Sequence, residues 1–157
     1  MRLSRSSAGN NIDAVTTHEA APPSRGQDRV VAEFRAQGGQ VGGYHASMQL
    51  LLLTTTGART GQRRAVPLTY VPDGDRYIVT AGNVGSDRHP AWYHNLMANP
   101  EATVEVGSEA FSAVAVVADE PERGSLYGRF AAVYPVADDY QAQTARQIPV
   151  VILTRRS

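Results

Sequence analysis

Residues 50–68 of this chain read LLLLTTTGARTGQRRAVPL: an apolar β run, a turn rich in glycine and arginine, and the start of a second β run. Four leucines followed by three threonines have the aliphatic and β-branched content of a strand that is buried on both faces. Gly57 and Gly61 enclose the turn between the two runs, so the stretch predicts a β-hairpin. We expect the rest of the fold to be organised around this hairpin.

The turn of this hairpin concentrates positive charge. It carries Arg59, Arg63 and Arg64, and no acidic residue occurs between Gln49 and Val71. Glycines allow neighbouring backbone amides to turn toward one point, and guanidinium groups bind phosphate and carboxylate oxygens through paired hydrogen bonds. The turn is therefore a candidate anion site, although a hairpin tip with merely solvated arginines would show the same pattern.

The composition excludes several kinds of chemistry. The 157 residues include no cysteine, and every one of the 15 Lys+Arg positions is arginine. Disulfides, thiolate nucleophiles, lysine Schiff bases and a Walker A loop are therefore ruled out. The formal net charge is zero, so we expect no nucleic acid partner.

The apolar runs are far shorter than the about 20 residues of a membrane-spanning helix. We predict a cytoplasmic protein without a transmembrane segment, and peripheral membrane contact stays open.

The length predicts one domain preceded by a leader. Residues 1–26 are polar, rich in Ser, Asn and Pro, and without a sustained period, which predicts a disordered leader. The folded domain then covers residues 27–157. A helix is expected from Asp28 and ends at Gly38 and Gly39, which begin a glycine-rich linker over residues 38–43. Because this stretch does not join a strand to a helix, it is a poor candidate for a dinucleotide loop.

The remaining pattern predicts an α+β fold that is mainly β. The predicted strands cover residues 50–56, a run through Pro67 to Val71, 76–81, 102–106, 110–117 and 149–153. Further helices are predicted over 91–98, 121–133 and 138–146. The first three strands follow one another through turns, which predicts a meander of adjacent strands. Six short strands in a mostly antiparallel sheet, with short flanking helices, favour a small barrel.

No autonomous catalytic constellation stands out. His89 and His94 are five residues apart across a proline, which is not the spacing of a two-histidine metal face, so we predict no metal site. The chain does offer an anion-binding turn, a loop of small residues at 82–89, one tryptophan and seven tyrosines. These features suit a bound cofactor that carries the chemistry itself.

Three segments resemble the deazaflavin-dependent nitroreductase family, whose members use coenzyme F420. They are LLLLTTTGARTGQRRAVPLTYVPDGDRYIVTAGN at 50–83, HPAWYHNLMANPEATVEV at 89–106 and VYPVADDYQAQTARQIPVV at 133–151. The resemblance covers roughly residues 33–154, and the three motifs occur in the right order. It implies a split β-barrel, which agrees with the strand pattern, and makes residues 27–157 a cofactor-binding domain.

Carried over residue by residue, the resemblance implies three groups of cofactor contacts. The phosphate and acidic tail of F420 would contact Ala58, Arg59, Thr60 and Arg64. The deazaflavin ring would lie against Ala65, Val66, Pro67, Thr80, Ala81, Gly82 and Asn83. One side would be closed by Ala91, Trp92, Tyr93, His94 and Asn95. The first group agrees with the anion site, because arginine binds phosphodiester and carboxylate groups bidentately.

The resemblance also implies a reaction, which is hydride transfer from C5 of the reduced deazaflavin to a small electrophilic acceptor. A quinone, an activated enone or a nitro compound would serve. Tyr134 and Tyr140 resemble family tyrosines on the substrate side of the ring and are the predicted catalytic residues, since a tyrosine hydroxyl can donate to a reduced oxygen. Aromatic packing under a C-terminal lid is the alternative role. Thr69 and Ala137 stand where well-known relatives carry tyrosine, so we expect a wider, less aromatic pocket.

Two other functions fit the same residues. The chain could be an F420-binding carrier without turnover of its own, or a split-barrel reductase that binds FMN. A cluster of arginines suits the longer and more acidic F420. Neither the physiological acceptor nor the choice between monomer and homodimer can be inferred from these motifs.

Overall fold

The computed structural model describes residues 25–156, so residues 1–24, which make up most of the predicted leader, and Ser157 lie outside the description. The first helix, α1 (Arg25–Ala36), begins before Asp28, which therefore lies in its first turn and not ahead of it. Within the described part, no helix is both long enough and apolar enough to cross a membrane.

Seven strands follow in the described chain. They are β1 (Leu50–Thr56), β2 (Arg63–Thr69), β3 (Val71–Asp73), β4 (Arg76–Thr80), β5 (Glu101–Val106), β6 (Glu109–Val117) and β7 (Val150–Arg155). The other helices are α2 (Ala91–Ala98), α3 (Glu122–Val133) and α4 (Val136–Ala142), with 3-10 turns η1 (Gly43–His45) and η2 (Asn83–Gly85). The strands form one sheet in the order β2-β1-β5-β6-β7-β4-β3, and their pairings are antiparallel.

The predicted α+β split-barrel class is confirmed, with seven strands instead of six. The predicted strand through Pro67 to Val71 divides at Tyr70, because β2 pairs with β1 whereas β3 pairs with β4. At this point the Tyr70 N–H donates to the Gln49 carbonyl at 3.2 Å, and the Tyr70 carbonyl accepts the Tyr134 hydroxyl at 2.9 Å. The predicted meander is therefore wrong: β4 pairs with β3 and β7, and β2 lies at the edge of the sheet.

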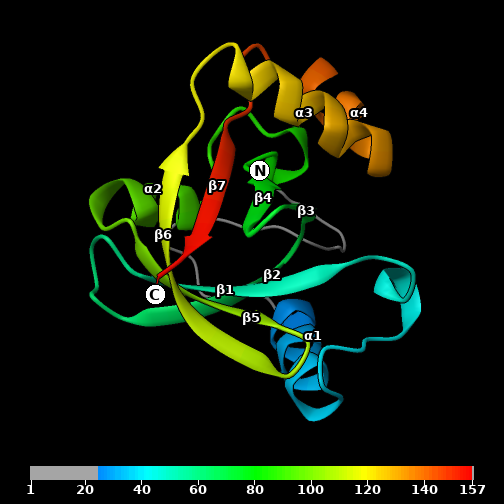
Figure 1. The fold of residues 1–157 in the computed structure, drawn as a ribbon, viewed down its shortest axis with the longest axis vertical. Coiled ribbons are helices and arrows are strands. Elements are labelled where there is room, and N and C mark those ends of the chain that lie inside the picture. The colour runs from blue at the N-terminus through cyan, green and yellow to red at the C-terminus, as the bar shows by residue number, and fades with distance from the viewer. Residues whose placement is uncertain (1–24, 157) are drawn as a thin grey trace.

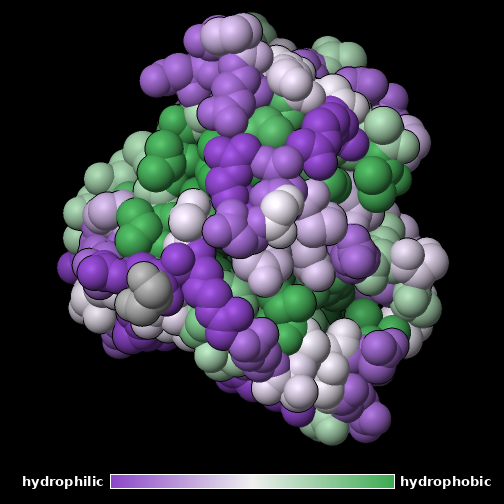
Figure 2. Space-filling model, viewed as in Figure 1, coloured by the Kyte–Doolittle hydropathy of each residue, from purple (hydrophilic) through white to green (hydrophobic). Residues whose placement is uncertain are grey.

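The sheet is curved, and the helices cover different parts of it (Figure 1). β1, β2 and β5 run across the lower part of the view with α1 beside them, while β4 and β7 rise toward α3 and α4. The α2 helix contacts β1. Polar side chains cover much of the face shown in Figure 2, and hydrophobic ones reach the surface mainly in hollows between them.

β1 is buried on both faces, as predicted. Leu51 and Leu53 are fully buried in the interior cluster that includes Trp92 of α2. The alternate leucines of β1 pack with Phe34 of α1 on the opposite face. Successive side chains of a strand point to opposite faces, so one apolar run can serve two hydrophobic clusters.

A close approach fixes α1 against the β5–β6 turn. Gly39 has a φ of +96°, and a Cβ at this position would lie 2.6 Å from the Cα of Gly107. Only glycine fits so near another backbone at a positive φ. Arg35 adds an ion pair with Glu105 of β5 at 2.8 Å. The C-terminal end of α1 and the residues that follow it are thereby held against β5 and the β5–β6 turn.

We expect the variant Leu53→Ala to lower the free energy of unfolding by about 2–5 kcal/mol, because it removes buried methyl groups and leaves a cavity in the interior cluster. Urea denaturation followed by circular dichroism measures the change. Val116→Ala is the matched control, since Val116 is 55% exposed and its truncation should change stability by no more than about 0.5 kcal/mol. Equal losses in both variants would contradict the assignment of this core.

Candidate functional site

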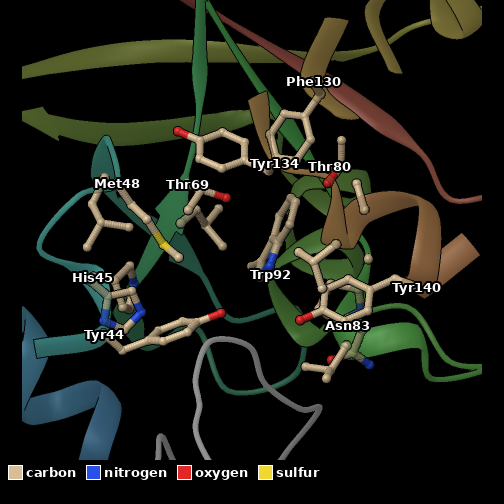
Figure 3. A pocket seen from close by; sticks show the side chains of 18 residues that line it. Tyr44, His45, Met48, Thr69, Thr80, Asn83, Trp92, Phe130, Tyr134 and Tyr140 are labelled. Atoms are coloured by element: carbon tan, nitrogen blue, oxygen red, sulfur yellow. The ribbon is translucent and has the colours of Figure 1, made fainter. Parts of the chain in front are cut away.

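One pocket brings together segments that are distant in the sequence (Figure 3). Its walls come from the segment that precedes β1, from β2, from the end of β4 with η2, from α2, and from the α3–α4 corner. The lining residues that were predicted as site residues are Pro67, Thr80, Gly82, Asn83, Trp92, Tyr134 and Tyr140. Thr69 and Ala137, the positions where relatives carry tyrosine, line it as well.

The other lining residues were not among the predicted site residues. They are Tyr44, His45, Met48, Leu50, Leu68, Val84, Pro90, Phe130 and Val136. The first three follow the glycine-rich residues 38–43, which were predicted to be a linker. Neither spacing nor periodicity relates them to the hairpin. Most of the remainder were predicted as members of strands or helices, but their exposure to a pocket depends on how those elements pack.

The other predicted site residues do not line this pocket. They are Ala58, Arg59, Thr60, Arg64, Ala65, Val66, Ala81, Ala91, Tyr93, His94 and Asn95. They divide between the β1–β2 turn with the adjoining part of β2, the buried residue Ala81, and α2. The three groups of predicted residues therefore lie in different parts of the structure.

The β1–β2 turn is tied to α2 by Asn95. The side-chain oxygen of Asn95 accepts the Ala58 N–H at 2.9 Å, and its amide nitrogen donates to Thr55 Oγ1 at 3.0 Å. Within the turn, Thr60 Oγ1 accepts the Gln62 N–H at 3.1 Å. Asn95 therefore positions the turn, and the Ala58 amide is already engaged with it.

The strand register separates the three arginines. Arg63 pairs with Thr56 of β1, and its guanidinium donates to Thr56 Oγ1 at 3.1 Å and to Thr103 Oγ1 at 2.8 Å. Arg64, the next residue, points to the opposite face and is half-buried, while Arg59 is exposed in the turn. Among the described residues, neither Arg59 nor Arg64 forms an ion pair. Two of the three guanidinium groups are thus available to an anion.

Arg146 holds the loop that follows β4. Its guanidinium donates to the carbonyl oxygens of Ala81 at 3.1 Å, Gly82 at 2.9 Å and Ser86 at 2.8 Å, and lies 3.0 Å from Nδ1 of His89. Burial lowers the pKa of Arg146, although an arginine remains charged in proteins. Sequence reasoning did not single out this residue, because its partners are mostly backbone carbonyls more than fifty positions away.

The same loop contains strained residues beside the pocket. Asn83 and Val84 have φ values of +48° and +55°, although neither is glycine. The Asn83 amide nitrogen donates to the Arg88 carbonyl at 2.8 Å, whereas its side-chain oxygen is buried without a partner in the described part of the chain. Positive φ at non-glycine residues clusters at functional sites. A buried acceptor in a pocket wall also indicates a ligand that would supply a donor.

The α2 residues Tyr93 and His94 lie beside His89. The ring of His89 is centred 4.5 Å from that of Tyr93 and 5.7 Å from that of His94. Among residues 25–156, no three His, Cys, Asp or Glu side chains gather in a way that could hold a metal ion. This cluster therefore closes α2 against the loop held by Arg146.

The two predicted catalytic tyrosines differ in their surroundings. The Tyr134 hydroxyl donates to the Tyr70 carbonyl at 2.9 Å, and burial raises its pKa. Tyr140 packs against Gly82, where an added Cβ would lie 3.2 Å from its ring. Its hydroxyl points toward the middle of the pocket (Figure 3). Tyr134 thus contributes its ring to the wall, and Tyr140 presents its polar end.

Comparisons with known proteins identify the relatives of this chain. The profile of the F420H(2)-dependent quinone reductase family matches residues 27–155. An F420H(2)-dependent quinone reductase of Mycobacterium tuberculosis is 41% identical over 116 residues, which cover 68% of this chain and 73% of that protein. A solved F420-H2 dependent reductase superposes with a TM-score of 0.62 at 36% identity, over 67% of this chain and 93% of that one. A solved domain-swapped dimer gives a TM-score of 0.64 at 34% identity, over 80% of this chain and 96% of that one.

Acidification is expected to weaken the fold through His45 and His89. Burial lowers the pKa of both imidazoles from the ordinary 6.5, and for His89 the charge of Arg146 and the neighbouring His94 act in the same direction. At acid pH the unfolded chain then binds more protons than the native state, so the free energy of unfolding falls as the pH drops below about 6.5.

Urea denaturation between about pH 7.5 and about pH 5.5 measures this decline, since imidazoles of the unfolded chain take up protons in that window. The double variant His45→Gln, His89→Asn should show a shallower decline than the wild type. An unchanged slope in the double variant would assign the decline to other groups.

Proposed function

This chain belongs to the F420H(2)-dependent quinone reductase family, and from this premise we propose that it reduces an uncharged, planar acceptor of the quinone class in the pocket beside Trp92. Membership of the family makes the chain an F420H(2)-dependent oxidoreductase, which selects F420 over FMN and an enzyme over a carrier. When bound, the reduced deazaflavin supplies a hydride. The choice of acceptor and the roles of individual residues are our proposal.

We choose an uncharged acceptor because the described residues that line the pocket include no acidic residue and no arginine. None of the 18 described residues that line it is Asp, Glu or Arg, and the wall includes the aromatic rings of Trp92, Phe130 and Tyr134. A substrate carboxylate or ammonium group would lose its hydration here without gaining a partner. A quinone loses little hydration on entry, because its carbonyl oxygens need only single hydrogen bonds.

The walls of the pocket also fit the ring of the cofactor. Asn83 offers a buried side-chain oxygen without a partner among the described residues, and the pyrimidine part of a deazaflavin carries an N–H that such an acceptor would bind. The loop from Ala81 to Ser86 is held rigid by Arg146. We therefore assign the ring to the wall formed by Thr80, Gly82 and Asn83.

The acidic tail of F420 needs positively charged partners, and the arginines of the β1–β2 turn would provide them. Arg64 precedes Leu68 of the pocket wall by four residues on β2, which places both side chains on one face of the strand, roughly 13 Å apart along it. The ribityl chain of F420 likewise separates its phosphate from its ring. Arg64 and Arg59 would bind the phosphate and the tail outside the uncharged pocket, because guanidinium groups favour such anions.

Tyr140 and Tyr134 would then have different tasks. The Tyr140 hydroxyl points into the pocket and would donate a hydrogen bond to a carbonyl oxygen of the acceptor, on the side of the loop that contains Gly82. The Tyr134 hydroxyl is engaged with the Tyr70 carbonyl, so its ring orients the acceptor. Around them the apolar wall excludes water from the reacting atoms.

The purified protein should bind F420 and, when given the reduced cofactor and menadione, oxidise it. The rise in visible absorbance as oxidised F420 re-forms reports turnover, and quenching of F420 fluorescence reports binding. Nitrobenzene and cyclohexenone serve as acceptors of the other two classes. Turnover with these but not with menadione would overturn the choice of a quinone. Binding without oxidation of any acceptor would contradict the whole proposal.

The variants Arg59→Ala and Arg64→Ala should each weaken F420 binding by about 10- to 100-fold, since a charge-assisted hydrogen bond contributes about 1.5–3 kcal/mol. The loss should shrink at high salt because the turn is solvent-accessible. Arg63→Ala is the matched control, since the Arg63 guanidinium binds hydroxyl groups of β1 and β5. Equal weakening by all three variants would contradict the placement of the tail.

A further inference from the structure

The feature that neither the fold nor the proposed reaction explains is a buried histidine. His45 is only 8% exposed and lines the pocket. Its Nε2 atom is buried and has no hydrogen-bond partner in the part of the chain that the structure describes. An unsatisfied polar atom in the interior destabilises a fold, whereas an apolar side chain of the same shape would not. The position therefore indicates a ligand that completes the hydrogen bond.

The backbone presents His45 to the pocket through a compact turn. Gly43 has a φ of +65° and begins η1, in which the Ala46 N–H donates to the Gly43 carbonyl at 3.1 Å and the Met48 N–H to the His45 carbonyl at 3.0 Å. Glu33 of α1 anchors the start of this turn, since its carboxylate accepts the Gly42 N–H at 3.0 Å. The backbone at His45 is thus held by its own segment, while Nε2 of the side chain has no partner among the described residues.

His45 lies across the pocket from the loop to which the cofactor ring is assigned. Figure 3 shows Tyr44, His45 and Met48 on one side of the cavity and Asn83 with Tyr140 on the other. The carbonyl oxygens of a para-quinone project from opposite ends of its ring. An acceptor that offers one oxygen to Tyr140 therefore turns the other toward the wall that contains His45.

We propose that Nε2 of His45 donates a hydrogen bond to the second carbonyl oxygen of the quinone and so positions the acceptor. This inference rests on the proposed function. Burial lowers the pKa of His45, so its imidazole is neutral at neutral pH and carries one N–H. The imidazole keeps this proton while it stabilises the negative charge that develops on the oxygen. The hydride comes from the reduced cofactor, and the proton that completes the hydroquinone is taken from solvent as the product leaves the pocket.

Three variants of the full chain test this role. His45→Phe and His45→Leu remove the donor, and His45→Gln keeps an N–H donor on a side chain of similar reach. Trp92 is the only tryptophan of the chain and lines the pocket, so quenching of its fluorescence by menadione reports occupation of the pocket without turnover. Steady-state assays with F420H2 and menadione give KM and kcat, and F420 fluorescence gives the affinity for the cofactor.

The apolar variants should weaken menadione binding and raise its KM by about tenfold, the effect of one hydrogen bond to a neutral group. His45→Gln should remain within about threefold of the wild type. F420 affinity should change little in any variant, and the apolar variants should not lower the melting temperature. Unchanged menadione binding in both apolar variants, or equal loss in His45→Gln, would overturn the inference. Failure of the wild type to oxidise F420H2 with menadione would instead overturn the proposed function, and the two failures are thereby distinguished.

Discussion

The burial of β1 on both of its faces is the constraint on which the other features depend. Its alternate leucines belong to the interior cluster with Trp92 and to the cluster with Phe34. A shift of one residue would exchange the two sets of side chains, so hydrophobic burial holds the register with β2. That register places Arg64 opposite Thr55 and Arg63 opposite Thr56. Which arginine lies on which face therefore follows from the packing of the leucines.

A second consequence is the separation of charged and uncharged parts of the site. β2 runs from the arginines of the turn to Pro67 and Leu68, which line a pocket without Asp, Glu or Arg among its described residues. A guanidinium group needs water or an anion nearby, whereas a planar, uncharged ring gains most from a dry wall. Along β2 a positively charged turn is thus followed by an uncharged pocket wall. A ligand with an anionic tail and a neutral ring has its groups in the same order.

The loop after β4 shows how a strained backbone is maintained beside this pocket. Positive φ at Asn83 and Val84 is unfavourable for residues that have a Cβ. Arg146 offsets this through bonds to three loop carbonyls, and its own burial is tolerated because each bond is made with a charged donor. Asn83 remains with one unsatisfied oxygen, and His45 with one unsatisfied nitrogen. Both unsatisfied atoms belong to residues that line the same pocket, and neither stabilises the fold without a ligand.

Local patterns in the sequence were sufficient for the hairpin, α2 and the α+β class, because these depend on neighbouring residues: the apolar run of β1, the glycines of the turn, and Pro90 ahead of Ala91–Ala98. The resemblance to F420-dependent enzymes identified the family for the same reason, since its motifs are contiguous. Only the tertiary structure decided that β2 ends before Tyr70, that Asn95 holds the turn, that His45 lines the pocket and that Arg146 holds the loop beside it. Each of these depends on contacts between segments that no short-range period relates, and burial of an unsatisfied atom exists only once the chain has folded around it.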